Sequence, residues 1–477
     1  MKLLPATGPA RVSQQSPLGS LLGQLALVVA ASAVAGLTLA ATGDIKIPLG
    51  LLALTTLGVL GFVRPALFLG LFLATRPLLD AFSDKQFVHG LASANPAGIL
   101  AVLMISMTLV ALTTSRRPVV PSAVTAFTLV VLLSAFGAAW AIVDLGGLVG
   151  TAPISELFRL TAMLAIFLLA ANLFGTVRRA QILATTLALS AVPPAAIGLV
   201  QWTQGVHPAP GFTVGRIDST FVGPNPFGAY LATSALLLIA GTPQLPRRVR
   251  LPSLVVVLAA LVGTYSREGW VIFLLGILLL GWRRHRVQVL AVAAGVTLLA
   301  FTVPAVHERV LPSNNGTVLP SGVAQKATFE SFSWRVGNWG KLLAKYEESP
   351  VIGYGLRSTA FVNPRRQDVL GAPGTGFEAH NLVVRALVEG GVVLLAAYVL
   401  LFVVLVREAR RMARASWPLQ QLARVVLVLW ILVIVVGLST DDPFSNTTMM
   451  FALLALAGSV EGARRAQRPK ATLEVRR

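Results

Sequence analysis

The sequence predicts an all-α polytopic membrane protein, a helical bundle of about 12–14 transmembrane helices with one large extracytoplasmic loop subdomain. Composition is the first reason, because 55% of the 477 residues are hydrophobic and only 12% are charged, whereas a soluble domain has about 25% charged residues. The second reason is that apolar runs recur along the chain. The third is that basic residues collect in the connections expected on one side of the membrane.

The apolar runs are the expected transmembrane helices. Helices are predicted because lipid offers no hydrogen-bond partner to an unpaired backbone group. Several runs are shorter than the roughly 20 residues that a span needs, notably those that flank Arg64 and Arg267. The runs are 18–41, 48–63, 65–79, 96–113, 121–143, 153–174, 180–200, 225–242, 251–265, 269–282, 287–305, 381–406, 420–439 and 447–460.

The basic connections predict the orientation. With the N-terminus inside, the cytoplasmic segments hold most of the 39 Lys and Arg residues, for example at 116–117, 178–179, 247–250 and 283–286. An excess of basic residues in cytoplasmic loops is the positive-inside rule. We therefore expect a multi-pass protein of the cytoplasmic (inner) membrane with both termini in the cytoplasm. The net charge of +20 is spread over short connections, which argues against a nucleic-acid partner.

One long polar segment divides the chain. Residues 306–379 lie outside on this topology, and a loop of this length in a compact protein is usually functional or disordered. Its aromatic residues, among them Trp339 and Tyr354, favour an ordered subdomain near the membrane surface. The expected parts are N-terminal transmembrane helices at 1–305, the extracytoplasmic loop at 306–379, C-terminal transmembrane helices at 380–461 and a basic cytoplasmic tail at 462–477.

Three ionisable residues fall on the outer side of this topology, although only cytoplasmic basic runs were used to build it. Arg216 precedes the run that starts at 225, Arg267 lies between two runs, and His380 opens a span. Two arginines at the membrane surface suit a lipid diphosphate, because a guanidinium binds phosphate oxygens in a bidentate way. A histidine can take the proton from an acceptor hydroxyl.

Each of these residues also has a purely structural interpretation. Arg267 is then an interfacial anchor neutralised by Glu268, Arg216 a loop residue bonded to Asp218, and His380 a helix-capping residue. For Arg335, the sequence favours substrate contact and packing within the loop equally.

Other polar groups are expected to pair internally or to face solvent. Asn381, Arg385 and Glu389 share a helix face at spacing i, i+4, i+8. Arg76 with Asp80 and Glu156 with Arg159 are expected to form ion pairs, and Asp441 and Asp442 are expected in a solvated turn rather than at a metal site. Cysteine is absent, which excludes a thiol nucleophile and disulfides.

Four short motifs resemble those of the O-antigen ligase and O-antigen polymerase superfamily of bacterial envelope glycan enzymes. They are GPNPFGA at 223–229, YSREGW at 265–270, an Arg and a Trp followed at a distance by Pro-x-x-Gly-x-Gly within 333–355, and HN followed by EGG within 380–391. Each motif is weak alone, whereas their order, spacing and common outer side are fairly specific.

The resemblance implies a GT-C-like membrane glycosyltransferase that needs no metal or other cofactor. The implied donor is an undecaprenyl-diphosphate-linked glycan, and the implied acceptor is a glycan, a lipid or a protein at the outer face of the lipid bilayer. By this resemblance Arg216 and Arg267 hold the diphosphate and His380 activates the acceptor hydroxyl. Arg335 and Asn381 are further expected substrate-binding residues.

Several functions remain open from the sequence. Within the family, a ligase, a repeat-unit polymerase and a protein O-oligosaccharyltransferase differ mainly in their acceptor. A transporter or lipid-linked glycan flippase is the alternative from another class, and it is expected to line a cavity with charges from many spans, whereas most spans here have none. A structural scaffold leaves the outer Arg and His residues unexplained.

Overall fold

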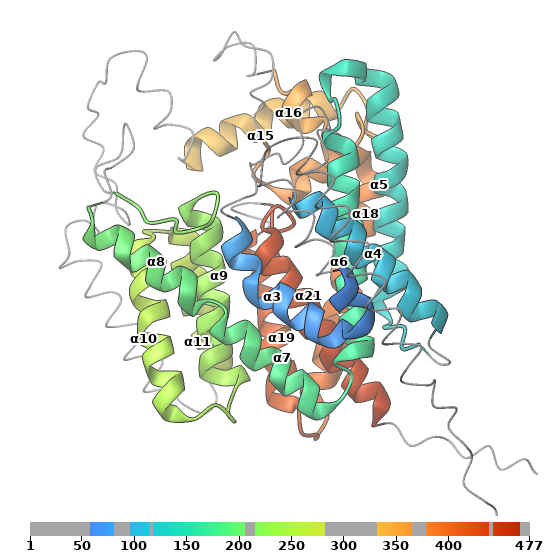
Figure 1. Ribbon diagram of the computed structural model, residues 1–477. Helices are drawn as coiled ribbons and strands as arrows, with labels where there is room; N and C mark the ends of the chain where they lie inside the picture. Colours follow the sequence, from blue (N-terminus) through green and yellow to red (C-terminus); the bar gives the residue numbers. More distant parts are fainter. Residues whose placement is uncertain are drawn as a thin grey trace, which may run out of the picture. The chain divides into compact units, whose positions relative to one another are not determined.

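Figure 1 shows the computed structural model of the chain. The structure describes residues 58–80, 96–114, 118–205, 215–281, 332–364, 378–437 and 442–467. By its internal contacts the chain divides into two compact units, Met1–Phe68 and Leu69–Arg477, and the features below belong to the second. Throughout the described ranges the regular secondary structure is helical, which confirms the all-α class. The expected spans at 18–41 and 287–305 lie outside the described residues.

The helices follow the apolar runs closely. They are α3 (Pro65–Leu79), α4 (Pro96–Thr114), α5 (Ala123–Leu145), α6 (Ala152–Leu173), α7 (Val177–Leu189), α8 (Val192–Thr203), α9 (Pro224–Leu236), α10 (Arg247–Gly263), α11 (Arg267–Gly281), α15 (Phe332–Tyr346), α16 (Thr359–Val362), α18 (Leu382–Arg414), α19 (Gln420–Leu432) and α21 (Thr447–Ala466). The π-helical turns η3 (Leu237–Gly241) and η4 (Val433–Gly437) extend α9 and α19, and the 3₁₀ turn η2 (Gly146–Leu148) follows α5.

Helix length and composition fit a multi-pass membrane protein. Among the described residues, four segments are long and apolar enough to cross a bilayer: Ala123–Leu148, Ala152–Leu173, Val177–Thr203 and Leu382–Arg414. Shorter apolar helices accompany them at Pro65–Leu79, Ala101–Thr113 and Gln420–Val436. Large apolar side chains face outward, with Val143 79% and Leu132 62% exposed. Such a surface is costly in water and favourable in lipid.

Small residues allow the closest helix contacts. A Cβ on Gly458 or Gly462 of α21 would collide with the backbone of Phe167 or Ala171 in α6. Helices α11 and α9 meet in the same way, because a Cβ on Gly269 of α11 would lie 2.7–3.0 Å from the backbone of Gly228 in α9. Close backbone approach through glycine is the usual way in which membrane helices associate.

The helix ends form two chemically different regions. The C-terminal ends of α3, α8 and α10 and the N-terminal ends of α6, α9, α11, α18 and α21 make up what we call the polar end. Hydrogen bonds join its members: Thr220 Oγ1 to Pro77 O, Arg76 Nη2 to Thr447 Oγ1, Ser219 N to Gln201 Oε1, Arg216 Nε to Thr264 O, Asn446 Nδ2 to Pro226 O and Arg385 Nη2 to Glu156 Oε1.

The opposite ends of the same helices form the basic end. Glu408 and Glu461 are its acidic members in the described helices, and they pair with arginines of α18 and α21. The start of α7 also lies at this end, close to Gly462 of α21. Arginines of the basic end include Arg178, Arg179, Arg247, Arg248, Arg250, Arg407, Arg410, Arg411, Arg414, Arg464 and Arg465.

A loop enters a break in α18. Gly391 has φ 62°, ψ −163°, which interrupts the helix. The 350–355 loop satisfies the freed backbone groups: Tyr354 N–H donates to Val388 O at 2.9 Å, Gly355 N–H to Glu389 O at 2.8 Å, and Val392 N–H to Pro350 O at 2.9 Å. The Pro-x-x-Gly-x-Gly and Glu-Gly-Gly motifs are therefore two halves of one contact.

Candidate functional site

The start of α9 and the turn between α10 and α11 form one junction at the polar end. Arg216 donates from Nε to Thr264 O at 3.0 Å and from Nη2 to Asn225 Oδ1 at 2.5 Å. The first bond ends at the turn that leads into Arg267, and the second at the first turn of α9. The structure therefore brings the segments of Arg216 and Arg267 together, and the Gly228–Gly269 contact explains why they can approach so closely.

Arg267 is the first residue of α11, and its side chain is exposed. The buried Ser266 precedes it, and Ser266 Oγ accepts a hydrogen bond from Gly269 N–H at 3.2 Å, as an N-terminal cap does. A positive side chain is unfavourable for the helix dipole at this end. The local structure therefore gives no helix-stabilising reason for an arginine here, whereas an anion is favoured at a helix N-terminus.

Asp218 lies half-buried near Arg216. Burial raises the pKa of the Asp218 carboxyl, while its backbone hydrogen bond and the Arg216 guanidinium act in the opposite direction. The neighbouring Ser219 donates from Oγ to Pro194 O at 2.6 Å, which ties this segment to α8.

His380 and Asn381 lie directly before α18. Asn381 is the N-cap of α18: its Oδ1 accepts hydrogen bonds from Val383 N–H at 2.9 Å and Val384 N–H at 3.1 Å. The capping role that one interpretation gave to His380 therefore belongs to Asn381. His380 itself is partly exposed and has φ 48°, a left-handed conformation.

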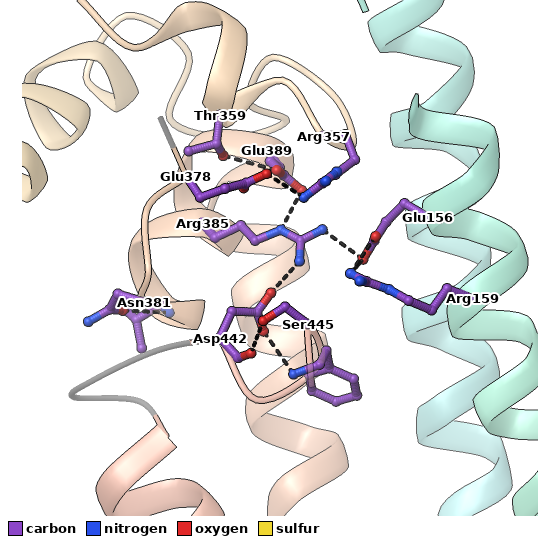
Figure 2. A network of polar contacts seen from close by, with 12 residues as sticks. Glu156, Arg159, Arg357, Thr359, Glu378, Asn381, Arg385, Glu389, Asp442 and Ser445 are labelled. Atoms are coloured by element: carbon purple, nitrogen blue, oxygen red, sulfur yellow. Dashed lines mark hydrogen bonds and ion pairs between the residues drawn. The ribbon is translucent and has the colours of Figure 1, made fainter. Parts of the chain in front are cut away.

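Arg385, one helical turn after Asn381, is the centre of a buried ion network (Figure 2). It donates from Nε to Glu389 Oε2 at 3.0 Å, from Nη2 to Glu156 Oε1 at 2.8 Å and from Nη1 to Asp442 Oδ2. Thr359 Oγ1 donates to Glu389 Oε1 at 3.0 Å. Four segments distant in the sequence therefore meet at the N-terminal third of α18.

Several predicted pairings are confirmed and one prediction is wrong. Arg385–Glu389, Arg76–Asp80 and Arg159–Glu156 are ion pairs in the structure. The expectation of a solvated turn fails for Asp442, which is 5% exposed because Arg385 neutralises it inside the protein. Asp441 lies outside the described residues.

The junction of Arg216 and the network of Arg385 are connected through one turn. Asn446, at the start of α21, donates to Pro226 O at 3.2 Å, next to Asn225. Asp442, four residues earlier, binds Arg385. The described structure thus connects the segments of Arg216, Arg267 and His380 through α9, α11, the 442–446 turn and α18.

Arg335 lies on α15, an amphipathic helix. It shares the helix face of Trp339, four residues later, and of the buried Leu342. Leu342 packs with Ala379, Val384 and Val388. Arg335 therefore lies on the side of α15 that packs on α18.

Backbone strain marks the same places. Among the described residues, the non-glycine residues with positive φ are Ser219, Tyr265, Arg357 and His380. Ser219 is three residues from Arg216, Tyr265 two residues from Arg267 and Arg357 two residues from Thr359 of the network, while His380 is itself one of the candidate residues. Residues held in such conformations cost about 1–3 kcal/mol each and cluster at functional sites.

Sequence reasoning misses two features of this region. It does not connect Glu156 and Asp442 with Arg385, since neither spacing nor periodicity relates residues so far apart. It marks Trp339 as an aromatic residue only, yet the Trp339 indole Nε1 donates to Ala379 O at 2.7 Å, directly before His380. In the described residues no group of three or more His, Cys, Asp or Glu side chains is arranged to hold a metal ion.

A comparison with known protein families gives a match that includes most of this region. Residues 252–399 match the family model described as O-antigen ligase. The matched range contains Arg267, Arg335 and His380, together with the 350–355 loop and the break in α18. The comparison with curated proteins gave no match. The match over residues 252–399 supports the resemblance to the O-antigen ligase superfamily and a function of the O-antigen ligase or polymerase type.

Proposed function

We propose that this protein transfers or polymerises a glycan from an undecaprenyl-diphosphate-linked donor at the outer face of the cytoplasmic membrane, with the polar end as its active site. The observation that carries the proposal is the junction where Arg216 binds the turn that leads into Arg267. Arg216, in the segment before α9, and Arg267, at the start of α11, then lie on neighbouring segments, which suits the binding of one diphosphate by two guanidinium groups.

The orientation of the proposal rests on the basic end. The arginines at the ends of α10, α18 and α21 favour the cytoplasmic side, which leaves the polar end outside. Both termini are then cytoplasmic.

The residues divide the chemical work between them. Arg216 and Arg267 bind the diphosphate and stabilise the negative charge that grows on it as the bond breaks. His380 accepts the proton of the acceptor hydroxyl, whose oxygen attacks the anomeric carbon from the opposite side. The new glycosidic bond forms as the bond from carbon to phosphate oxygen breaks, so the configuration inverts and undecaprenyl diphosphate leaves. The proton on His380 then passes to solvent.

Arg335 and Asn381 have supporting places in this proposal. Arg335, on the inner face of α15, is suited to contact polar groups of the donor or acceptor. Asn381 uses Oδ1 to cap α18, so its amide nitrogen is the part suited to a substrate hydroxyl. The fixed arginine charges supply the electrostatic stabilisation that a metal supplies elsewhere, which supports a metal-independent reaction.

The test is transfer by the purified protein in detergent with EDTA present. The assay follows release of undecaprenyl diphosphate from a lipid-diphosphate glycan with a glycan, lipid or peptide acceptor. Wild type is expected to be active, and His380→Asn inactive, because asparagine tolerates a left-handed backbone while removing the base. Arg410→Gln, at an exposed arginine of the basic end, is the control and is expected to keep full activity. Full activity of His380→Asn would refute the proposal.

The products of the same assay identify the acceptor class. A ladder of increasing size indicates a polymerase, one product on a lipid indicates a ligase, and a glycosylated peptide indicates a protein O-oligosaccharyltransferase.

A further inference from the structure

Residues 378–381, the short segment that contains His380, are held from several directions. Trp339 Nε1 donates to Ala379 O at 2.7 Å. Arg357 Nη1 donates to Glu378 Oε1 at 2.6 Å. On the other side of His380, Asn381 is fixed by its two capping bonds. The backbone around His380 is therefore fixed both before and after the residue.

The Trp339 bond is the one nearest to His380 on its N-terminal side. The Ala379 carbonyl belongs to the peptide unit whose nitrogen is that of His380, so the position of this carbonyl sets the plane from which the His380 φ angle is measured. A distance of 2.7 Å lies at the short end of ordinary N–H···O hydrogen bonds. The neighbouring bond from Asn338 Nδ2 to Glu378 O is 3.4 Å long and weaker.

Packing fixes Trp339 in turn. Leu342 is fully buried and packs with Ala379, Val384 and Val388, and Trp339 lies against this cluster. Asn338 is also fully buried, and its Oδ1 accepts from Asn363 Nδ2 at 2.8 Å. The helix that presents the indole is thus anchored both to α18 and to the segment after α16.

The left-handed conformation of His380 requires such support. A non-glycine residue with φ 48° is strained, and such conformations persist only where the surroundings impose them. Release of the Ala379 carbonyl lets the residue relax to a right-handed or extended conformation, which swings the imidazole away.

We propose that Trp339 is a positioning residue that sets the direction of the His380 imidazole through the Ala379 carbonyl. The proposal rests on the proposed function, in which His380 is the base. In this arrangement the extracytoplasmic helix α15 aligns the base without touching the reacting atoms.

The experiment compares Trp339→Phe with Trp417→Phe. Trp417 is the matched control because its Nε1 also donates to a backbone carbonyl, Met412 O, at 2.8 Å, in the turn that leaves α18 at the basic end. Trp339→Phe is expected to lower kcat by roughly tenfold to a hundredfold while KM for the donor stays within about twofold, because misplacement of a catalytic group by about 1 Å has effects of this size. Trp417→Phe is expected to leave both values unchanged.

A second variant keeps the shape of the side chain. Benzothienylalanine at position 339 replaces the indole N–H with sulfur and keeps the ring volume, so folding is preserved while the hydrogen bond is lost. It is expected to reproduce the low kcat of Trp339→Phe. Wild-type kcat in this variant would overturn the proposal.

A chemical readout separates this proposal from the proposed function. The rate at which diethyl pyrocarbonate modifies His380, followed by mass spectrometry of its peptide, is expected to change in both position-339 variants and not in Trp417→Phe. An unchanged rate would overturn the positioning role even if transfer is lost. If His380→Asn remains active, the proposed function fails, whereas a changed modification rate would still support the positional link between Trp339 and His380.

Discussion

Arg385 Nη2 in α18 donates to Glu156 Oε1 in α6 at 2.8 Å, although 229 positions separate the two residues. Both side chains are almost fully buried, at 5% and 3% exposure. The same guanidinium also neutralises Glu389 and Asp442. This contact therefore fixes the N-terminal part of α18, and with it His380, to the remainder of the polar end.

Replacement of Arg385 by methionine is expected to be strongly destabilising. The change removes the guanidinium that Glu156, Glu389 and Asp442 share, although Glu156 keeps its ion pair with Arg159. Removal of one partner from a buried ion pair costs about 3–5 kcal/mol. Thermal unfolding in detergent, followed by fluorescence-detected size exclusion, measures the effect. Arg414→Met, at the exposed C-terminal end of the same helix, should match wild type; equal midpoints for the two variants would show that the network does not hold α18.

Gly391→Ala tests the contact between the 350–355 loop and the break in α18. A Cβ at Gly391 would collide with the backbone of Pro350 and Val351, and φ 62° is strained for alanine by about 1 kcal/mol or more. We expect little folded protein from this variant. Gly340→Ala in α15 is the control, because a Cβ there meets nothing within 4 Å. Similar yields of folded protein from both variants would contradict the account of the break.

Gly269→Ala tests the junction that brings Arg216 and Arg267 together. The added methyl group would press on the backbone of Gly228, and overpacking of this kind costs about 1–3 kcal/mol. Relief requires α11 to move away from α9, so donor binding should weaken even in the fraction that folds. Gly147→Ala, where a Cβ meets nothing within 4 Å, should bind donor normally. The measurement is donor affinity of the monodisperse fraction, and unchanged affinity in Gly269→Ala would separate the junction from the donor site.

The raised pKa of Asp218 predicts that the stability difference between wild type and Asp218→Asn depends on pH. Burial raises the pKa of its carboxyl in the folded protein, so its favourable contribution is present below the unfolded pKa and is lost as pH rises through the folded value. Asp218→Asn removes this titration. The unfolding midpoint of the variant relative to wild type should therefore increase as pH rises from about 4 to 7. A constant difference between Asp218→Asn and wild type across this range would contradict the burial effect.

The sequence alone predicted those features that depend on local patterns of residues. Apolar runs predicted where most of the described apolar helices begin, because a membrane helix needs a continuous apolar length. Helices α18 and α21 continue past their runs into polar sequence, and the run 180–200 is divided between α7 and α8. The spacing i, i+4 predicted the Arg385–Glu389 pair, since such residues lie on one helix face. The match over residues 252–399 confirms the family resemblance that the motifs suggested.

The parts that the sequence did not reveal depend on contacts between distant segments. Asp442 reads as a polar turn residue before Pro443, and only the packing of α21 beside α18 places it against Arg385. The left-handed φ of His380 has no local signal, since the residue is neither a glycine nor next to one. The bond between Trp339 and Ala379 joins two residues 40 positions apart.

The most direct test of the central claim is the affinity of the purified protein for an undecaprenyl-diphosphate-linked glycan, measured for wild type, Arg216→Gln, Arg267→Gln and His380→Asn. Loss of one charge-assisted hydrogen bond costs about 1.5–3 kcal/mol, so each arginine variant should bind the donor roughly ten- to a hundredfold more weakly. His380→Asn should bind as wild type does, because the base acts on the acceptor. Wild-type affinity in both arginine variants would contradict the assignment of the polar end as the diphosphate site.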